Sequence, residues 1–419
     1  MKVVVQKFGG SSVANLERMR QVQEKVERKL NKGYKVVAVL SAMSGETDRL
    51  LNLAEDFSSS PDKDELDTLL CTGEQTSTAL FSMLMRDKNI KTRSVQGFQI
   101  PMHTDSFFGK SRIRNISSEN LLNLLNDYDV LAVAGFQGCD QDQRLTTLGR
   151  GGSDTSAVAL AAALDAELCE IFSDVDGVFT TDPNVCMQAQ KMDRIAYDEM
   201  LEMASMGAKV LQIRSVEFAK KYNVPVHVRS TFNDIPGTLL VQEDKNMEGA
   251  LVSGIAYDKN QARITLVNVF DQPGIASKVF NPLAEAGIVV DMIVQNFSKE
   301  NKTDITFTVS REELEKALEI IEETKDEIGA VDILSDTNVA KVSVIGVGMR
   351  NHSGVAGIAF KALDTENINI MIISTSEIKI SCLVEEKYTE LAVRTLHEAF
   401  ELDKSTSDSY MENEQAERC

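Results

Sequence analysis

The chain opens with Lys2-Val3-Val4-Val5-Gln6-Lys7-Phe8-Gly9-Gly10-Ser11-Ser12, and this stretch decides the fold. Its apolar start predicts a buried strand, and apolar residues at spacings of three and four from Val13 to Leu30 predict a helix after it. A glycine turn between a strand and a helix lets the backbone N–H groups and the helix dipole face an anion. With the charge of Lys7 added, the segment predicts a phosphate site, and the alternative is an ordinary turn with a serine cap.

Two other glycine-rich segments do not match the common nucleotide motifs. Gly109-Lys110-Ser111 has Thr104 where a P-loop needs its first glycine, and no predicted strand precedes it. We interpret that match as accidental. Residues 346–351 likewise lack the last glycine of a dinucleotide-binding fingerprint.

Composition excludes several classes of protein. The 419 residues suggest about three domains, and 43% apolar with 26% charged residues is typical of a soluble globular protein. A net charge of −20 argues against nucleic-acid binding. No apolar stretch is long enough for a membrane span, and the N-terminus does not resemble a signal peptide. The six cysteines have no metal-site spacing, so we expect reduced thiols and a cytoplasmic protein.

Residues 1–242 alternate predicted strands and helices, which indicates an α/β domain. Predicted strands cover 36–40, 130–134, 170–172 and 224–228, and predicted helices cover 153–166 and 198–206. Such alternation predicts a mostly parallel sheet with helices on both faces, an αβα sandwich. Ligands of such sheets bind at the carboxyl ends of the strands, so the loops there are the candidate site.

The second part of the chain contains an internal repeat with an offset of 80 residues. Gly274-Ile275-Ala276 aligns with Gly354-Val355-Ala356, and the apolar positions that follow align as well. Each copy, 263–335 and 341–402, predicts the β-α-β-β-α-β order of a ferredoxin-like domain. Residues 243–262 form a connector whose strand at 251–256 is expected to join this sheet. The polar residues 403–419 predict a disordered acidic tail.

Three further loops of the first domain suit ligand binding. The hydroxyl-rich segment 41–47 follows a strand, with a plain loop as the alternative. Segment 147–154 is a second glycine turn that opens a helix, and its central Arg150 suits a carboxylate, with a Ser153 helix cap as the alternative. Segment 172–183 offers acidic and hydroxyl groups to a nucleotide, or is an Asx turn before a hairpin. Two glycine-rich helix starts predict two anions that meet, a nucleotide triphosphate and a carboxylate substrate.

Taken together, these motifs resemble aspartate kinase, and the tandem repeat resembles the ACT domains that follow the kinase domain in that family. The resemblance covers residues 1 to about 402, with all motifs in order. The motifs are Lys7-Phe-Gly-Gly-Ser-Ser12, Ser41-Ala-Met-Ser44, Thr72-Gly-Glu74, Gly135-Phe-Gln-Gly138, Thr147-Leu-Gly-Arg-Gly-Gly-Ser-Asp154, Ser173-Asp-Val-Asp-Gly177 and Thr181-Asp-Pro183.

The resemblance implies ATP-dependent phosphorylation of the side-chain carboxylate of L-aspartate, giving 4-phospho-L-aspartate. This is the first step of the pathway to lysine, threonine and methionine. A carboxylate with a solution pKa of about 3.9 is already an anionic nucleophile at neutral pH, so no general base is needed. The chain has only four histidines, and none lies in these loops, which fits such a reaction.

The resemblance also assigns roles to residues. Lys7, Asp154 and Arg150 form the catalytic set, in which Lys7 stabilises the transferred phosphoryl group and Arg150 clamps the α-carboxylate of aspartate. The substrate site is completed by Ser41, Thr47, Glu74 for the ammonium group, Gly151, Gly152 and Ser153. ATP is expected at Lys7, Gly9, Gly10, Ser11, Ser173, Asp174, Phe179, Asp182 and Lys209, with Mg²⁺ bridging the phosphates and no protein ligand assigned to the metal. Phe179 and Asn184 depart from the tyrosine and arginine common in the family.

For the repeat, the resemblance implies feedback inhibition by lysine, threonine or both, with self-association through the ACT domains. The expected effector residues are Asp271, Gly274, Ile275, Ala276, Asp291 and Gln295 in the first copy, and Val355, Ala356, Asn369, Ile370 and Glu377 in the second. One or both copies could instead be purely structural. Some relatives also make a short regulatory subunit, for which Met247 is a suitable start.

Two rival interpretations of the whole chain stay open. One is an amino-acid kinase that acts on glutamate or acetylglutamate. The other is a non-catalytic amino-acid sensor that kept the fold, against which the intact Lys7, Glu74, Arg150 and Asp154 argue.

Overall fold

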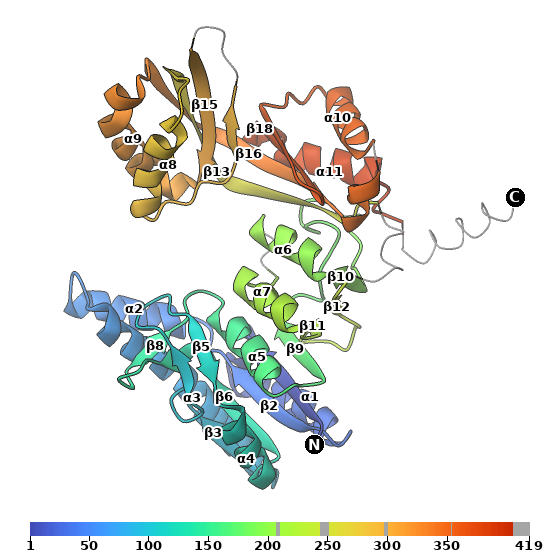
Figure 1. The fold of residues 1–419 in the computed structure, drawn as a ribbon. Coiled ribbons are helices and arrows are strands. Elements are labelled where there is room, and N and C mark those ends of the chain that lie inside the picture. Colours follow the sequence, from blue (N-terminus) through green and yellow to red (C-terminus); the bar gives the residue numbers. More distant parts are fainter. Residues whose placement is uncertain (207–209, 244–250, 297–300, 353, 405–419) are drawn as a thin grey trace, which may run out of the picture. The chain divides into compact units, whose positions relative to one another are not determined.

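The computed structural model describes residues 1–206, 210–243, 251–296, 301–352 and 354–404 (Figure 1). The chain divides into two compact units. The first comprises 1–179, 191–205 and the described part of 209–247, and the second comprises 180–190, Met206 and the described residues from 251 onward. Each unit is described by itself.

An eight-stranded sheet forms the centre of the first unit, in the order β10-β12-β11-β9-β1-β2-β6-β3. Neighbouring strands are parallel except for β11 and β12. The strands are β1 (Val3–Phe8), β2 (Lys35–Leu40), β3 (Thr92–Val95), β6 (Val130–Ala134), β9 (Leu168–Ser173), β10 (Arg194–Ala196), β11 (Val226–Ser230) and β12 (Thr238–Val241). The predicted mostly parallel sheet is confirmed.

Helices cover both faces of this sheet, as the alternation of side chains along β1 requires. Val4 and Phe8 belong to the core under α1 (Leu16–Leu30) and α3 (Lys63–Asp87). Lys7 points to the other face, where it contacts α5 (Gly152–Ala163). Residues 152–161 of α5 are all buried, so this helix shows no amphipathic pattern in the sequence.

The carboxyl ends of four central strands lie in register. Phe8 pairs with Leu40 on one side and with Phe172 on the other, and Leu40 pairs with Ala134. The loops that follow β1, β2, β6 and β9 therefore share one edge of the sheet. From β1 the chain continues to β2 on one side, and it later returns to β9 on the other side. Open α/β sheets bind ligands at such a switch in strand order.

The segment after the glycine turn does not form the serine-capped helix start that was the alternative to a phosphate site. A 3₁₀ turn (η1, Gly10–Val13) comes first, and no side chain caps it. Helix α1 begins only at Leu16, and the side chain of Asn15 caps it by accepting from the N–H of Arg18. The alternative of a serine cap is therefore not observed, and Asn15, a residue type favoured at this position, caps the helix instead.

The remaining elements of the first unit surround the sheet. A smaller sheet has the order β5-β4-β7-β8, with β4 (Met102–Thr104), β5 (Ile113–Ile116), β7 (Gln137–Cys139) and β8 (Leu145–Thr147). Four more helices complete the unit: α2 (Glu46–Phe57), α4 (Ser118–Asp127), α6 (Tyr197–Ser205) and α7 (Ile213–Tyr222).

The second unit is built on a six-stranded antiparallel sheet in the order β14-β15-β13-β16-β18-β17. Its strands are β13 (Gly254–Phe270), β14 (Ile293–Gln295), β15 (Lys302–Val309), β16 (Asp332–Ile345), β17 (Ile372–Thr375) and β18 (Lys379–Glu385). Helices α8 (Ile275–Glu285) and α10 (Val355–Thr365) begin and end 80 residues apart, as the repeat predicts.

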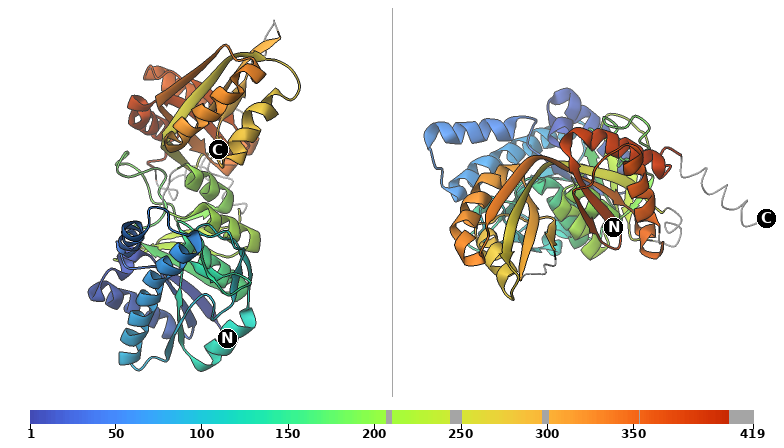
Figure 2. Two further views of the ribbon diagram at one scale, coloured as in Figure 1. Left: turned by 90° about the vertical axis from the view of Figure 1, so that its left-hand side faces the viewer. Right: turned by 90° about the horizontal axis from the view of Figure 1, so that it is seen from above.

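Each copy has its own core between the sheet and a pair of helices (Figure 2). Helix α9 (Leu314–Ile328) pairs with α8, and α11 (Thr389–Ala399) pairs with α10. The strand expected at 251–256 is the start of β13, where Gly254 pairs with Ile345 at the end of β16. Both central strands thus run through both copies, and the ferredoxin-like prediction is confirmed.

Residues 180–190 lie in the second unit, although the sequence placed them inside a continuous first domain. The carbonyl oxygen of Thr180 accepts a hydrogen bond from the N–H of Ile255 at 2.7 Å. Its hydroxyl lies 2.9 Å from Nε2 of the buried His397 in α11. Tyr257 donates its hydroxyl to Asp182 at 3.0 Å. The chain therefore leaves the first unit after Phe179 and returns to it at Lys191.

Candidate active site

Lys7 and Asp154 form the charged centre of the site. Nζ of Lys7, near the end of β1, lies 2.6 Å from Oδ1 of Asp154 in the first turn of α5. The two side chains are only 12% and 11% exposed. A nearly buried lysine at the carboxyl edge of a parallel sheet is a positive charge with little competing water, which suits a phosphate group.

The glycine turn after β1 lies close to two neighbouring strands. The N–H of Gly9 donates to the carbonyl of Phe172 at 3.2 Å. A Cβ atom on Gly10 would lie 3.0 Å from the carbonyl oxygen of Ala42, so the loop after β2 leaves little room for a side chain there. Ser11 is exposed, whereas Ser12 is buried and its hydroxyl lies 2.6 Å from that of Thr231. Of the two serines, Ser11 is the one available to a ligand.

Glu74 places a carboxylate under the loop after β2. It lies in α3, is 4% exposed, and its Oε1 accepts from the N–H of Ala42 at 3.0 Å. Its Oε2 is buried and has no hydrogen-bond partner among the described residues. Burial raises the pKa of this carboxyl to about 7. An unpartnered buried carboxylate oxygen suits a cationic group such as an ammonium.

The two hydroxyl residues expected at the substrate lie on either side of the turn that joins β2 to α2. Ser41 follows β2 directly and its N–H donates to the carbonyl of Phe8 at 3.1 Å. Thr47 lies in the first turn of α2, after Gly45, which has a positive φ of 78°. Both side chains are half-buried.

The second glycine turn presents Arg150 between two glycines with positive φ angles, 78° at Gly149 and 66° at Gly151. A Cβ atom on Gly151 would lie 2.6 Å from Cβ of Gln212. Nε2 of Gln212 donates to the carbonyl of Arg150 at 2.7 Å. The backbone of Arg150 is thus fixed while its side chain is exposed. Gly152, Ser153 and Asp154 follow as the buried start of α5.

The third loop, residues 174–179, follows the end of β9. The hydroxyl of the half-buried Ser173 donates to the exposed Asp174 at 2.9 Å, and Thr238 Oγ1 accepts from the N–H of Val178 at 2.8 Å. The half-buried Phe179 ends the loop and forms an isolated bridge with Lys191. Of the other residues expected at ATP, Asp182 lies in the second unit, and Lys209 lies outside the described residues.

The described residues contain no group of three or more His, Cys, Asp or Glu side chains that could hold a metal ion. Mg²⁺ in phosphoryl-transfer sites is held by substrate phosphates and water with one or two carboxylates, so the expected ion does not require such a group.

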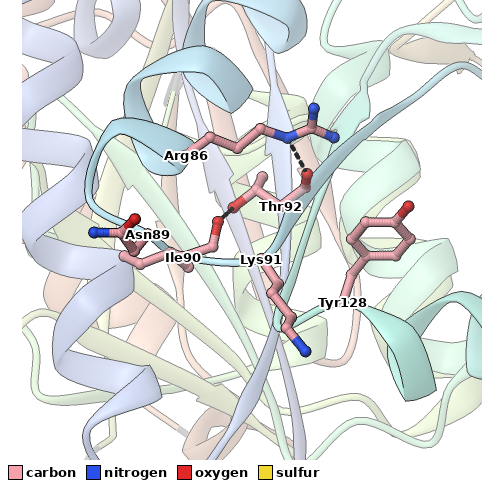
Figure 3. A pocket seen from close by; sticks show the side chains of 6 residues that line it. All are labelled: Arg86, Asn89, Ile90, Lys91, Thr92 and Tyr128. Atoms are coloured by element: carbon pink, nitrogen blue, oxygen red, sulfur yellow. Dashed lines mark hydrogen bonds between the residues drawn. The ribbon is translucent and has the colours of Figure 1, made fainter.

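A shallow hollow of about 300 Å³ lies at the opposite edge of the sheet (Figure 3). It is lined by Arg86, Asn89, Ile90, Lys91, Thr92 and Tyr128. Arg86 Nε donates to the carbonyl of Thr92 at 2.8 Å, and the Thr92 hydroxyl donates to the carbonyl of Ile90. Because these groups hydrogen-bond to one another at the amino ends of β3 and β6, we do not assign this hollow to the site.

The sequence motifs do not reveal the residues that support the Arg150 loop. Asp67 is buried and accepts from Thr147 and Gly109, and Arg214 donates to the carbonyl of Leu148 at 2.6 Å. One sequence feature lies next to them, Gly109-Lys110-Ser111, whose match to a P-loop we interpret as accidental. It is no P-loop, but its loop packs against the Arg150 loop: a Cβ on Gly149 would lie 3.2 Å from the Gly109 carbonyl oxygen.

The expected effector residues at the starts of α8 and α10 lie at equivalent places in the two copies. Gly274 and Gly354 precede α8 and α10 and have positive φ angles of 91° and 140°. Ile275 and Val355 are buried, and Ala276 and Ala356 follow them in the first turns. Asp271 precedes the first turn and Gln295 ends β14. Two of the residues are already in ion pairs: Asp291 with the buried Lys341, and Glu377 with Arg350 at 3.6 Å.

Four of these residues lie outside the strands of the sheet. Asp291 precedes β14, Asn369 and Ile370 precede β17, and Glu377 follows β17. Strands β14 and β17 are only three and four residues long, so the segments before them are loops at the sheet edges.

Comparisons with known proteins agree with this architecture. A model described as the Amino acid kinase family matches residues 2–230, and one described as an ACT domain matches residues 264–324 and 342–400. The aspartate kinase of Pseudomonas putida is 52% identical over 404 residues, 96% of this chain and 98% of that protein. The aspartokinase of Helicobacter pylori is 50% identical over 406 residues, 96% of this chain and 100% of that one.

The chain belongs to the aspartate kinase family. As an aspartate kinase it is an enzyme with a kinase domain and C-terminal ACT domains, which confirms the family assignment made from the sequence motifs. Escherichia coli aspartokinase III in complex with aspartate and ADP (R-state) has a TM-score of 0.79 and 27% identity, covering 95% of this chain and 99% of that one. The same enzyme in complex with lysine and aspartate (T-state) has a TM-score of 0.76 and 28% identity, covering 96% and 100%.

Proposed function

We propose that this aspartate kinase joins the side-chain carboxylate of L-aspartate to the terminal phosphoryl group of ATP at the carboxyl edge of the parallel sheet. The observation that carries the proposal is the position of Lys7, 2.6 Å from Asp154 and directly before the glycine turn. The same edge holds the Arg150 loop, and α3 places the buried carboxylate of Glu74 there. It therefore offers opposite charges to each ionic group of the two substrates.

In this proposal the substrate carboxylate attacks without a general base. Glu74 holds the ammonium through its unpartnered Oε2, and Arg150 clamps the α-carboxylate. Ser41 and Thr47 line the pocket, with Gly151, Gly152 and Ser153 at its floor. Lys7 neutralises charge on the phosphoryl group as it moves, and Asp154 holds the ammonium of Lys7 beside the reacting centre.

The nucleotide is assigned to the other side of the same edge. The glycine turn at Gly9 and Gly10 is assigned to the phosphates, to which the N–H of Gly10 and the hydroxyl of Ser11 would donate. Ser173, Asp174, Phe179, Asp182 and Lys209 are assigned to the remainder of ATP. The ADP complex of E. coli aspartokinase III supports the use of ATP. Mg²⁺, when bound, supplies further positive charge to the phosphates, and phosphate oxygens and water would be its main ligands.

We propose the second unit as the site of feedback control by lysine, threonine or both, through the residues beside α8 and α10. The lysine-bound T-state of E. coli aspartokinase III supports an amino-acid effector. Self-association through the ACT domains, and a separate short subunit beginning at Met247, which lies outside the described residues, belong to this proposal.

We also propose a cytoplasmic location and no membrane or nucleic-acid partner. Among the described residues, no helix has the length and apolar character needed to cross a bilayer. The five described cysteines are free and buried, which fits a reducing compartment.

A hydroxamate assay tests the reaction. Hydroxylamine traps an acyl phosphate, so the protein with ATP, Mg²⁺ and L-aspartate should form aspartyl hydroxamate. L-glutamate and N-acetyl-L-glutamate as sole acceptors should give little product. Product with either of these but not with aspartate would favour another amino-acid kinase. No product with any acceptor, together with retained amino-acid binding, would favour a sensor.

A further inference from the structure

Helix α3 carries a second buried carboxylate, Asp67, seven residues before Glu74. Asp67 is 1% exposed. Its Oδ2 accepts from the N–H of Thr147 at 2.7 Å and from the N–H of Gly109 at 2.9 Å, and its Oδ1 accepts from the hydroxyl of Thr147 at 2.7 Å. Seven residues make about two helical turns, so Asp67 and Glu74 lie on the same face of α3.

The three donors belong to two segments that are distant from α3 in the sequence. Thr147 ends β8 and begins the loop that carries Arg150. Gly109 lies in the loop between β4 and β5, which also binds the Arg150 loop, since the N–H of Ser111 donates to the carbonyl of Thr147 at 2.9 Å. The carboxylate of Asp67 therefore ties both loops to the helix that holds Glu74.

The far side of the Arg150 loop is held by the start of α7. Nη1 of Arg214 donates to the carbonyl of Leu148 at 2.6 Å, and Nη2 of the same side chain donates to the carbonyl of Ser111 at 3.0 Å. Gln212 holds the carbonyl of Arg150. Asp67 thus supplies the contacts from α3, and α7 supplies the contacts from the opposite side.

The charge of Asp67 is balanced by hydrogen bonds rather than by a cation. Among the ion pairs of the described residues none involves Asp67, although Asp64 and Glu65 beside it both pair with Arg144. Burial raises the pKa of the Asp67 carboxyl, and its three hydrogen bonds act in the opposite direction. Removing the carboxylate would leave two backbone N–H groups without their acceptor, which is costly in a buried site.

We propose that Asp67 is a positioning residue for aspartate binding, because it fixes the Arg150 loop relative to Glu74. This inference rests on the roles proposed above for Arg150 and Glu74. The ammonium and the α-carboxylate of an amino acid are attached to the same carbon atom, so the two protein groups that bind them must keep a fixed separation. Helix α3 sets that separation, with Glu74 as one contact and Asp67 as the anchor of the other.

The test compares Asp67→Ala, Asp67→Asn and the control Asp64→Ala in steady-state assays with each substrate varied. Asp67→Ala should raise the KM for aspartate roughly tenfold or more and leave the KM for ATP within about twofold. Asp67→Asn should recover most of the loss, because a rotated amide can accept from both N–H groups and donate to the Thr147 hydroxyl. Asp64→Ala, on the same helix, removes an ion pair with Arg144 and a local hydrogen bond from the N–H of Glu65, neither of which reaches the Arg150 loop, and should behave like the parent protein.

An unchanged aspartate KM in Asp67→Ala, or an equal rise in both KM values, would overturn the inference. If Asp67→Ala does not fold, Thr147→Val decides, since it removes only the hydroxyl contact: a selective rise in the aspartate KM supports the inference and no rise overturns it. Arg150→Ala, assayed in parallel, distinguishes a failure of this inference from a failure of the proposed function. If Arg150→Ala leaves the aspartate KM unchanged, the assigned role of Arg150 has failed, whatever Asp67→Ala does.

Discussion

The side chain of Lys7 is held in place for the phosphoryl group that is proposed to be transferred. It extends from the central strand to the first turn of α5, where Asp154 holds it at 2.6 Å. Since the pair is nearly buried, little water screens the ammonium, and the attraction between it and an arriving phosphoryl group is stronger than it would be in water.

Replacing Lys7 should therefore abolish most catalysis and leave the fold intact. Lys7→Ala is expected to lower kcat by roughly 10³-fold or more, because comparable cations at transferred phosphoryl groups contribute that much. The measurement is coupled ATP turnover at saturating aspartate, with circular dichroism as the check on folding. Lys2→Ala is the matched control, since Lys2 is a 69% exposed lysine that precedes the amino end of the same strand. A variant of Lys7 that keeps most of its activity would refute the assigned role.

Glu74 should make aspartate binding depend on pH. Its pKa is raised to about 7 by burial, and only the ionised form can bind an ammonium. We expect kcat/KM for aspartate to fall as the pH drops below about 7, and Glu74→Gln to give a low, flat profile. Glu65→Gln, an exposed carboxylate on the same helix, should keep the parent profile. A parent profile that is flat between pH 6 and 8 would contradict the proposal, where these limits bracket the pKa of about 7.

The raised pKa of Glu74 also makes the free energy of unfolding depend on pH. Between the ordinary pKa of 4.5 and about 7, the folded protein binds more protons at Glu74 than the unfolded chain does. This group therefore favours the folded state at low pH, and its contribution is lost as the pH rises through about 7.

The sequence predicted the residues that face the ligands better than the residues behind them. Lys7, the glycine turn and Arg150 stand in short motifs whose chemistry can be understood locally. Asp67 cannot be understood in this way, because its partners lie 42 and 80 residues further along the chain. Its role depends on two loops that meet only after β8 has paired with β7. An isolated aspartate in a helical pattern is indistinguishable from one on a solvated face.

At the scale of elements, the start of α5 is where strand β6 and the Arg150 loop meet. Gly135 follows β6, and a Cβ atom there would lie 2.7 Å from Oγ of Ser153. Asp154 is the next residue along α5. The glycine after β6 is therefore required by the close approach of this helix, and its position controls the direction of the first turn.

Gly135→Ala should displace that first turn and reduce activity. We expect a loss of about 1–3 kcal/mol in the free energy of unfolding, typical of overpacking, together with a drop in kcat of roughly tenfold. Gly357→Ala is the control, because Gly357 lies within α10 with nothing within 4 Å of the added Cβ. It should be neutral or slightly stabilising. Thermal unfolding and turnover measure both effects, and equal behaviour of the two variants would contradict the packing argument.

Helix α5 also marks a limit of sequence patterns. Its residues 152–161 are buried on all sides, so no apolar stripe indicated which face meets the sheet. The clear stripe from Val13 to Leu30 had the opposite problem: it predicted α1 but placed its start too early. The 3₁₀ turn contains Ser12, which is buried against Thr231 in a tertiary contact that no local pattern shows, whereas the Asn15 cap is a local contact with the N–H of Arg18.

At the scale of the whole molecule, regulation should appear as a change in apparent aspartate affinity. Saturating lysine, threonine or their mixture is expected to shift the aspartate saturation curve by a coupling of about 1–3 kcal/mol, or roughly 5- to 150-fold in affinity. The measurement is initial rate against aspartate concentration with each effector. D-lysine and D-threonine are the controls, because a site that binds both the ammonium and the carboxylate of an amino acid distinguishes mirror images. Curves that stay unchanged under all conditions would rule out these effectors.

The two long strands β13 and β16 make the repeat inseparable. Each strand contributes one half to the first copy and the other half to the second, and the register shifts between Asp258 and Arg263 mark the crossing. A truncation within 254–345 would therefore remove part of both copies, however carefully the domain boundary were chosen. Engineering a sensor from one copy would require a replacement strand. For the same reason we expect the two copies to fold and unfold together as one cooperative unit.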